Sequence, residues 1–83
     1  MEKTPNLIEF DIRGQHGSST LLAALKEIDN QKTRIKEGTI KLLIRTDNRY
    51  CTMTIPHAVH VMGYGVKVTS VSDHFVIVIE NDT

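Results

Sequence analysis

Alternating apolar and polar residues predict two strands that are buried on one face and exposed on the other. The first covers residues 8–12, where Glu9 and Asp11 separate the apolar side chains, and Gly14 follows its end. The second covers residues 39–45. This period of two is typical of half-buried strands. The side chains expected to face the core are Ile8, Phe10, Ile12, Ile40, Leu42 and Ile44.

A helix is predicted between these strands. Residues 17–20 (Gly-Ser-Ser-Thr) offer hydroxyl groups at a helix start, strong helix formers follow, and Asn30 is expected to close the helix. Residues 31–38 are predicted to form a polar, mostly basic connection to the second strand. The face predicted to be buried consists of Leu21, Ala24, Leu25 and Ile28.

A second helix is expected over residues 54–62, after a loop at residues 47–49. Thr54 is the candidate cap, Pro56 fits a first helical turn, and Gly63 is a good C-terminal stop. The predicted buried face is Ile55, Ala58, Val59 and Met62.

The last third of the chain predicts a hairpin. Residues 66–71 and 75–79 are rich in β-branched side chains, and the Ser-Asp-His sequence at 72–74 supplies a tight turn. The final strand is apolar on both faces, so we expect it in the middle of the sheet, where both sides are partly covered.

Together these elements predict an α+β two-layer sandwich with the order β-α-β-α-β-β. Right-handed crossovers place both helices on one face of a four-stranded mixed sheet. We expect one domain over residues 1–83, with a flexible tail at 1–5 and a frayed end at 80–83. The other sheet face stays open, either as plain surface or as a contact surface for a partner or a second copy. That face is expected to present Glu9, Asp11, Lys41, Leu43, Arg45, Val76 and Val78.

Composition narrows the function classes. The 83 residues include ten basic and ten acidic side chains, so no net charge draws the chain toward nucleic acid or acidic lipid. One cysteine excludes an internal disulfide and a cysteine-rich zinc site. The first residues contain no apolar run typical of a signal peptide, and residues 75–79 are too few to cross a membrane. We therefore expect a cytoplasmic protein with no membrane contact.

Several short motifs at matching distances resemble one family. Residues 11–14 (Asp-Ile-Arg-Gly) end the first strand shortly before a helix start, and Asp47-Asn48 precedes Ile55-Pro56 by eight residues. With Gly63 and the element order, these features resemble the TusA-like (SirA-like) sulfur carriers over nearly the whole chain. The resemblance implies the two-layer fold. In that family, the first helix begins with a Cys-Pro-x-Pro motif whose cysteine carries sulfur as a persulfide.

The chain departs from the family at that cysteine. Gly17 stands in its place, followed by Ser18 and Ser19. A persulfide needs a thiolate, and a serine hydroxyl cannot hold a transferable sulfur atom. We therefore expect a TusA-like domain that acts as a non-catalytic binding or regulatory protein in a sulfur- or redox-related system, with no cofactor. Its expected partner is a protein.

The single thiol supplies an alternative function. We expect Cys51 in the loop between the second strand and the second helix, near the position of the family's cysteine. It could act as a relocated sulfur carrier, with Arg49 or Arg13 stabilising the thiolate. A small, half-buried structural residue is the simpler interpretation.

Other candidate sites have simple structural explanations as well. His57 and His60 lie three apart on one predicted helix, but no third ligand is evident, so we expect no metal. The first helix start could bind a small anion, although capping explains the same residues. A basic middle segment leaves RNA binding as a second alternative, without the usual aromatic platform. Its residues are Lys32, Arg34, Lys36, Lys41, Arg45 and Arg49. The residues predicted to contact a ligand or partner are Arg13, His16, Gly17, Ser18, Ser19, Asp47 and Arg49.

Overall fold

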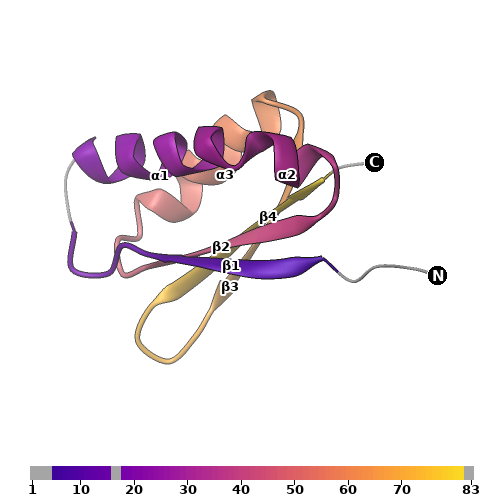
Figure 1. Ribbon diagram of the computed structural model, residues 1–83. Helices are drawn as coiled ribbons and strands as arrows, with labels where there is room; N and C mark the ends of the chain where they lie inside the picture. Colours follow the sequence, from indigo (N-terminus) through magenta and orange to yellow (C-terminus); the bar gives the residue numbers. More distant parts are fainter. Residues whose placement is uncertain (1–4, 16–17, 82–83) are drawn as a thin grey trace.

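The computed structural model describes residues 5–15 and 18–81. Its four strands form one mixed sheet with the order β1-β2-β4-β3, in which β1 and β2 are parallel and the other neighbours are antiparallel. The helices lie on one face of this sheet (Figure 1). The predicted two-layer sandwich is confirmed. The elements are β1 (Asn6–Asp11), α1 (Ser18–Asn30), α2 (Lys32–Lys36), β2 (Ile40–Thr46), α3 (Cys51–Val61), β3 (Tyr64–Ser70) and β4 (Phe75–Asn81).

The last strand, β4, lies inside the sheet as its two apolar faces predict. Val78 of β4 pairs with Leu43 of β2 on one side and with Lys67 of β3 on the other. At the start of β4, Phe75 pairs with Thr46, the last residue of β2. The β3–β4 turn therefore lies at the same end of the sheet as the carboxyl ends of β1 and β2.

The core lies between the sheet and the helices. The alternation in β2 is confirmed, since Ile40, Leu42 and Ile44 are all buried, and the inward residues of β1 also pack against the core. Leu43 points to the opposite face but is only 8% exposed. The fully buried side chains of the core include Ile12, Ala24, Ile28, Ile35, Leu42, Ile44, Ile55, Val59, Ile77 and Ile79.

The segment expected to be a polar connection contains a short additional helix, α2. Ile35 is fully buried and fixes this single turn to the core. Lys36 then ties α2 to the end of α3, because its Nζ lies 3.4 Å from the carbonyl oxygens of both Met62 and Gly63. The same Nζ lies 4.4 Å from the centroid of the Tyr64 ring, a cation–π contact. One apolar residue gives no periodicity, so the sequence pattern missed this helix.

Helix α3 begins at Cys51, three residues before the predicted start at 54. The prediction that Thr54 caps the helix is wrong, because its Oγ1 donates to the carbonyl oxygen of Tyr50 within the first turn. Pro56 consequently lies inside the helix and not in its first turn. The stop at Gly63 is confirmed by its positive φ of 92°. Met62, expected to be buried, is 43% exposed because it lies beyond the last helical residue.

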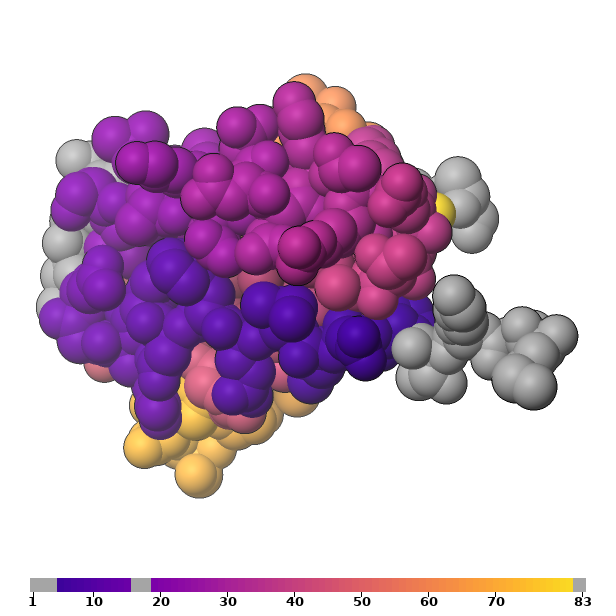
Figure 2. Space-filling view, viewed as in Figure 1, coloured from indigo at the N-terminus to yellow at the C-terminus, as the bar shows by residue number. Residues whose placement is uncertain are grey.

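Both hairpin strands are two residues longer than predicted at the end away from the turn. β3 begins at Tyr64, and β4 continues through Asn81, so residues 80 and 81 belong to a strand and not to a frayed end. The turn end of the hairpin points away from the helices (Figure 1) and projects from the rest of the molecule (Figure 2). Val68 and Val71 are accordingly 43% and 37% exposed. No helix in the described residues is long and apolar enough to cross a membrane.

Candidate functional site

Three connections meet at one end of the sheet, which we call the carboxyl edge and define as residues 12–15, 47–50 and 71–74. The first two follow the parallel strands β1 and β2, and the third is the β3–β4 turn. In open α/β sheets, ligands bind in the crevice outside the carboxyl ends of parallel strands. The topology therefore makes this edge the first place to look for a site.

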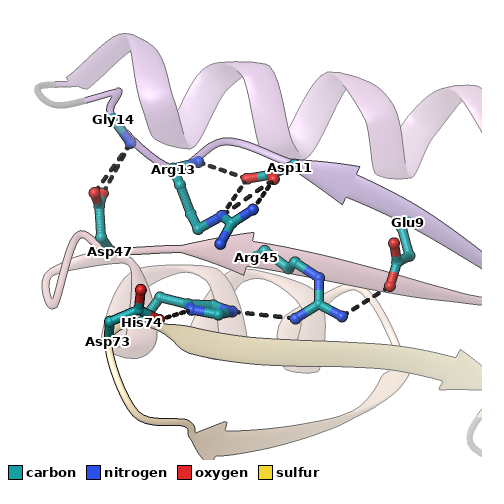
Figure 3. Close-up of polar contacts among 8 residues, drawn as sticks. All are labelled: Glu9, Asp11, Arg13, Gly14, Arg45, Asp47, Asp73 and His74. Carbon is teal, nitrogen blue, oxygen red and sulfur yellow. Dashed lines mark hydrogen bonds and ion pairs between the residues drawn. The ribbon is translucent and has the colours of Figure 1, made fainter.

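A carboxylate joins two of the three connections. The Gly14 N–H donates to both oxygens of Asp47, at 3.1 Å each (Figure 3). Gly14 has a φ of 84°, a conformation that a residue with a Cβ adopts only with strain. The bond fixes the β1–α1 connection to the β2–α3 connection across 33 residues of sequence.

The β2–α3 connection is also held by its own side chains. The Oγ1 of Thr46 accepts from the Asn48 N–H, and the Oδ1 of Asn48 accepts from the Tyr50 N–H, both at 3.0 Å. These are the Asx- and Ser/Thr-type contacts that fix turns. The connection and the helix that follows it each present one large apolar side chain to solvent: Tyr50 is 65% exposed, and Met53, in the first turn of α3, is 72% exposed.

Arg13 is predicted to contact a ligand or partner, but its guanidinium is already engaged. Its Nη2 lies 2.7 Å from Oδ2 of Asp11 and its Nε lies 3.0 Å from Oδ1 (Figure 3). The side-chain hydrogen bonds lower the pKa of Asp11 to about 2, and the same pair raises the pKa of Arg13. Arg13 therefore offers little free positive charge to an anion.

A chain of polar contacts beside this pair joins β1, β2 and the β3–β4 turn. Arg45 donates from Nη2 to Oε1 of Glu9 at 2.9 Å, and its Nη1 lies 3.1 Å from Nε2 of His74 (Figure 3). The other ring nitrogen, Nδ1, lies 2.6 Å from Oδ1 of Asp73. The geometry assigns the proton to Nδ1, because an Nε2–H would face the Arg45 donor. The hydrogen bond to His74 lowers the pKa of Asp73.

The prediction that Cys51 lies in a loop is wrong. Cys51 is the first residue of α3 and is buried, with 1% exposure. Burial raises the pKa of its thiol. A nucleophilic or sulfur-carrying cysteine requires an accessible thiolate, and both properties of Cys51 oppose that. The simpler interpretation, a small packed residue, fits its place in the hydrophobic core.

The remaining predicted site residues are either outside the described residues or exposed. His16 and Gly17 lie outside the described residues, as does the side chain of Ser18. Ser19 is exposed in the first turn of α1, and Arg49 is exposed at the carboxyl edge without an ion pair among the described residues.

The two histidines considered as metal ligands are both exposed on α3. His57 and His60 have no third partner, since residues 5–15 and 18–81 contain no group of three side chains arranged to hold a metal.

The basic middle segment does not form one surface. Lys41 and Arg45 are on the sheet face opposite the helices, where they meet Glu80 and Glu9. Lys36, by contrast, is on α2 and contacts the end of α3. This separation weighs against a continuous basic surface for RNA.

Comparison with protein-family models, with curated proteins and with solved structures gave no significant match.

Sequence reasoning missed the chain of contacts through Arg45 and His74. The contact between Glu9 and Arg45 could have been inferred from the strands. The parallel register places Asp11 opposite Arg45, so Glu9 is a diagonal neighbour of Arg45, and diagonal neighbours on one sheet face can touch. The approach of His74 depends on how the hairpin aligns with β2, which no local pattern specifies.

Proposed function

We propose that this chain is a TusA-like domain without the sulfur-carrying cysteine, which serves as a non-catalytic binding protein in a sulfur- or redox-related system. Its partner is a protein that docks at the carboxyl edge. The motifs at residues 11–14, 47–48 and 55–56 support the family assignment, together with the parallel strands β1 and β2, which are followed by α1 and α3 respectively.

The main support for docking is the exposure of apolar side chains at a well-fixed edge. Tyr50, three residues after Asp47, is 65% exposed, and Met53, in the first turn of α3, is 72% exposed. Leu22, near the start of α1, is 66% exposed at the same end of the helical layer. Tyrosine and arginine dominate the energetics of many interfaces, and Arg49 lies directly beside Tyr50. A pre-ordered loop loses little conformational entropy on binding.

The chemistry at the edge supports binding over catalysis. The only thiol is buried. Asp11 is paired with Arg13, and His74 is held between Asp73 and Arg45. A general base needs a free acceptor directed at a substrate proton, and these groups already have partners within the protein.

Site-specific photocrosslinking in cells tests the proposal. A photoreactive amino acid at position 49 should give discrete protein adducts. The same amino acid at Glu37, which is exposed at the opposite end of β2, should not give them. Tyr50→Ser combined with Met53→Ser should remove the adducts. Identical adducts from both positions, or none from position 49, would contradict docking at this edge.

A further inference from the structure

The sheet face opposite the helices, which we call the open face, is covered by no other element of the described chain (Figure 1). The strand register arranges its side chains in three rows that run from β1 through β2 and β4 to β3. The rows are Leu7–Lys41–Glu80–Gly65, Glu9–Leu43–Val78–Lys67 and Asp11–Arg45–Val76–Thr69.

The middle row has acid at one end, base at the other, and apolar residues between them. Glu9 is on the outer strand β1, where its Oε1 accepts from Arg45 at 2.9 Å while the side chain remains 53% exposed. Lys67, on the outer strand β3, is exposed and makes no ion pair among the described residues. Leu43 and Val78 lie side by side in the centre. If a second copy of this row is turned end for end and laid against the first, acid meets base and apolar side chains meet apolar side chains.

We propose that the open face binds a second copy of this chain, with the two-fold axis parallel to the strands and passing between β2 and β4. This operation brings β1 of one copy opposite β3 of the other and keeps each row opposite itself. Glu9 then faces the second copy's Lys67, and Leu43 faces its Val78. In the neighbouring row, Lys41 faces the second copy's Glu80. Every one of these contacts occurs twice by symmetry.

The competing two-fold axis, perpendicular to the strands, pairs like charges. It brings β1 opposite β1, so that Glu9 faces the second copy's Glu9 and Lys67 faces its Lys67. It also exchanges the outer rows and places Lys41 opposite the second copy's Arg45. Juxtaposed like charges disfavour an interface, so charge alone selects the axis parallel to the strands.

Steric complementarity agrees with the same axis. Leu7 is 53% exposed at one end of its row, and Gly65 is at the other end. Gly65 is not among the glycines with positive φ, so backbone conformation does not explain its presence in β3. A glycine within a strand often marks a close approach by another group. In the proposed dimer, Leu7 enters the space above the second copy's Gly65.

The size of the face sets the strength of association. Four strands about 4.8 Å apart and seven residues at about 3.3 Å each span roughly 450 Å² per copy, or about 900 Å² in total. Stable interfaces bury about 1,200–2,000 Å², so we expect a reversible dimer with a Kd in the micromolar to millimolar range. Packed sheets cross at about 30°. Glu9 and Lys67, on the outer strands, lie about 7 Å from the two-fold axis, so this crossing angle moves each of them about 4 Å away from the position directly opposite its partner. Glu9 and Lys67 are long enough to span that displacement.

The test uses two charge-reversal variants, Glu9→Lys and Lys67→Glu, measured by sedimentation velocity up to about 1 mM protein. Wild type should move from the 9.4 kDa monomer toward a dimer as concentration rises. Each variant alone opposes like charges twice, so its dimer should be about tenfold or more weaker. In a mixture, both contacts again join opposite charges, and the heterodimer should form with about the wild-type affinity.

Further measurements separate docking from misfolding. Both variants should keep the wild-type circular dichroism. Lys67→Glu removes no bond within the described chain, whereas Glu9→Lys also removes the 2.9 Å contact with Arg45, so Lys67→Glu is the cleaner single variant. Gly65→Thr favours the strand conformation while blocking Leu7 of the second copy, so it should weaken the dimer without lowering the melting temperature. The proposal is overturned by a wild-type protein that stays monomeric at about 1 mM, by folded charge variants that dimerise as wild type does, or by a mixture without heterodimer.

Discussion

The bond between Gly14 and Asp47 is the contact that joins two connections of the carboxyl edge, and its removal has a measurable cost. Asp47→Ala deletes both acceptor oxygens that lie 3.1 Å from the Gly14 nitrogen. A hydrogen bond contributes about 1 kcal/mol net, and bonds to charged groups contribute about 1.5–3 kcal/mol. Asp47 is exposed, so solvent screening favours the lower value. We expect a loss of about 1 kcal/mol in the free energy of unfolding.

Two assays measure this loss, one over the whole chain and one at the bond. Urea unfolding followed by circular dichroism should show a lower midpoint with an unchanged slope. Amide hydrogen exchange should accelerate at Gly14 about fivefold, because about 1.4 kcal/mol corresponds to a factor of ten. Asp47→Asn keeps one acceptor oxygen without the charge and should lie between wild type and Asp47→Ala in both assays.

A second aspartate provides the control. Asp29 is also exposed, and its Oδ1 lies 3.7 Å from Nζ of Lys32. Asp29→Ala should leave Gly14 exchange unchanged and should not destabilise the chain, since alanine favours the helix. An Asp47→Ala protein with wild-type stability and wild-type exchange at Gly14 would refute the assigned role of this bond.

Three further predictions follow from other contacts. A carbon-detected NMR titration should give Asp11 a pKa of about 2, and Arg13→Gln should return it toward 3.8. Because the folded pKa lies below the unfolded one, the pair's stabilisation is fully present above pH 3.8 and is lost as the pH falls through about 2. Cys51 should react with Ellman's reagent about a hundredfold more slowly in the native protein than after unfolding; equal rates would show an accessible thiol. Thr20→Val should raise the free energy of unfolding by about 1 kcal/mol, because the Thr20 Oγ1 is buried without a hydrogen-bond partner in the described part of the chain; a loss of stability would mean that the hydroxyl does have a partner.

The sheet could be predicted from the sequence because its signals are local and repeated. The alternation at Ile40, Leu42 and Ile44 identifies β2 and its buried face, and the apolar run in β4 indicates its central place. The short helix α2 could not be predicted, because one buried residue, Ile35, determines its packing.

The candidate site was predictable only in its location. Parallel β1 and β2 imply that the connections containing Gly14 and Asp47 share an edge, but the bond between them depends on loop geometry. The start of α3 was misplaced because the side chain of Asn48 orders the residues before Cys51, a contact with no periodic signature. The helix that results buries the thiol.

Mass spectrometry after incubation with a cysteine desulfurase and cysteine is the measurement that most directly tests whether this chain carries sulfur. No mass increase by one sulfur atom is expected on the native protein, because Gly17 stands where the TusA-like proteins that this chain resembles have their cysteine, and because Cys51 is buried. A single-sulfur adduct on the folded wild type that is absent from Cys51→Ser would contradict this expectation.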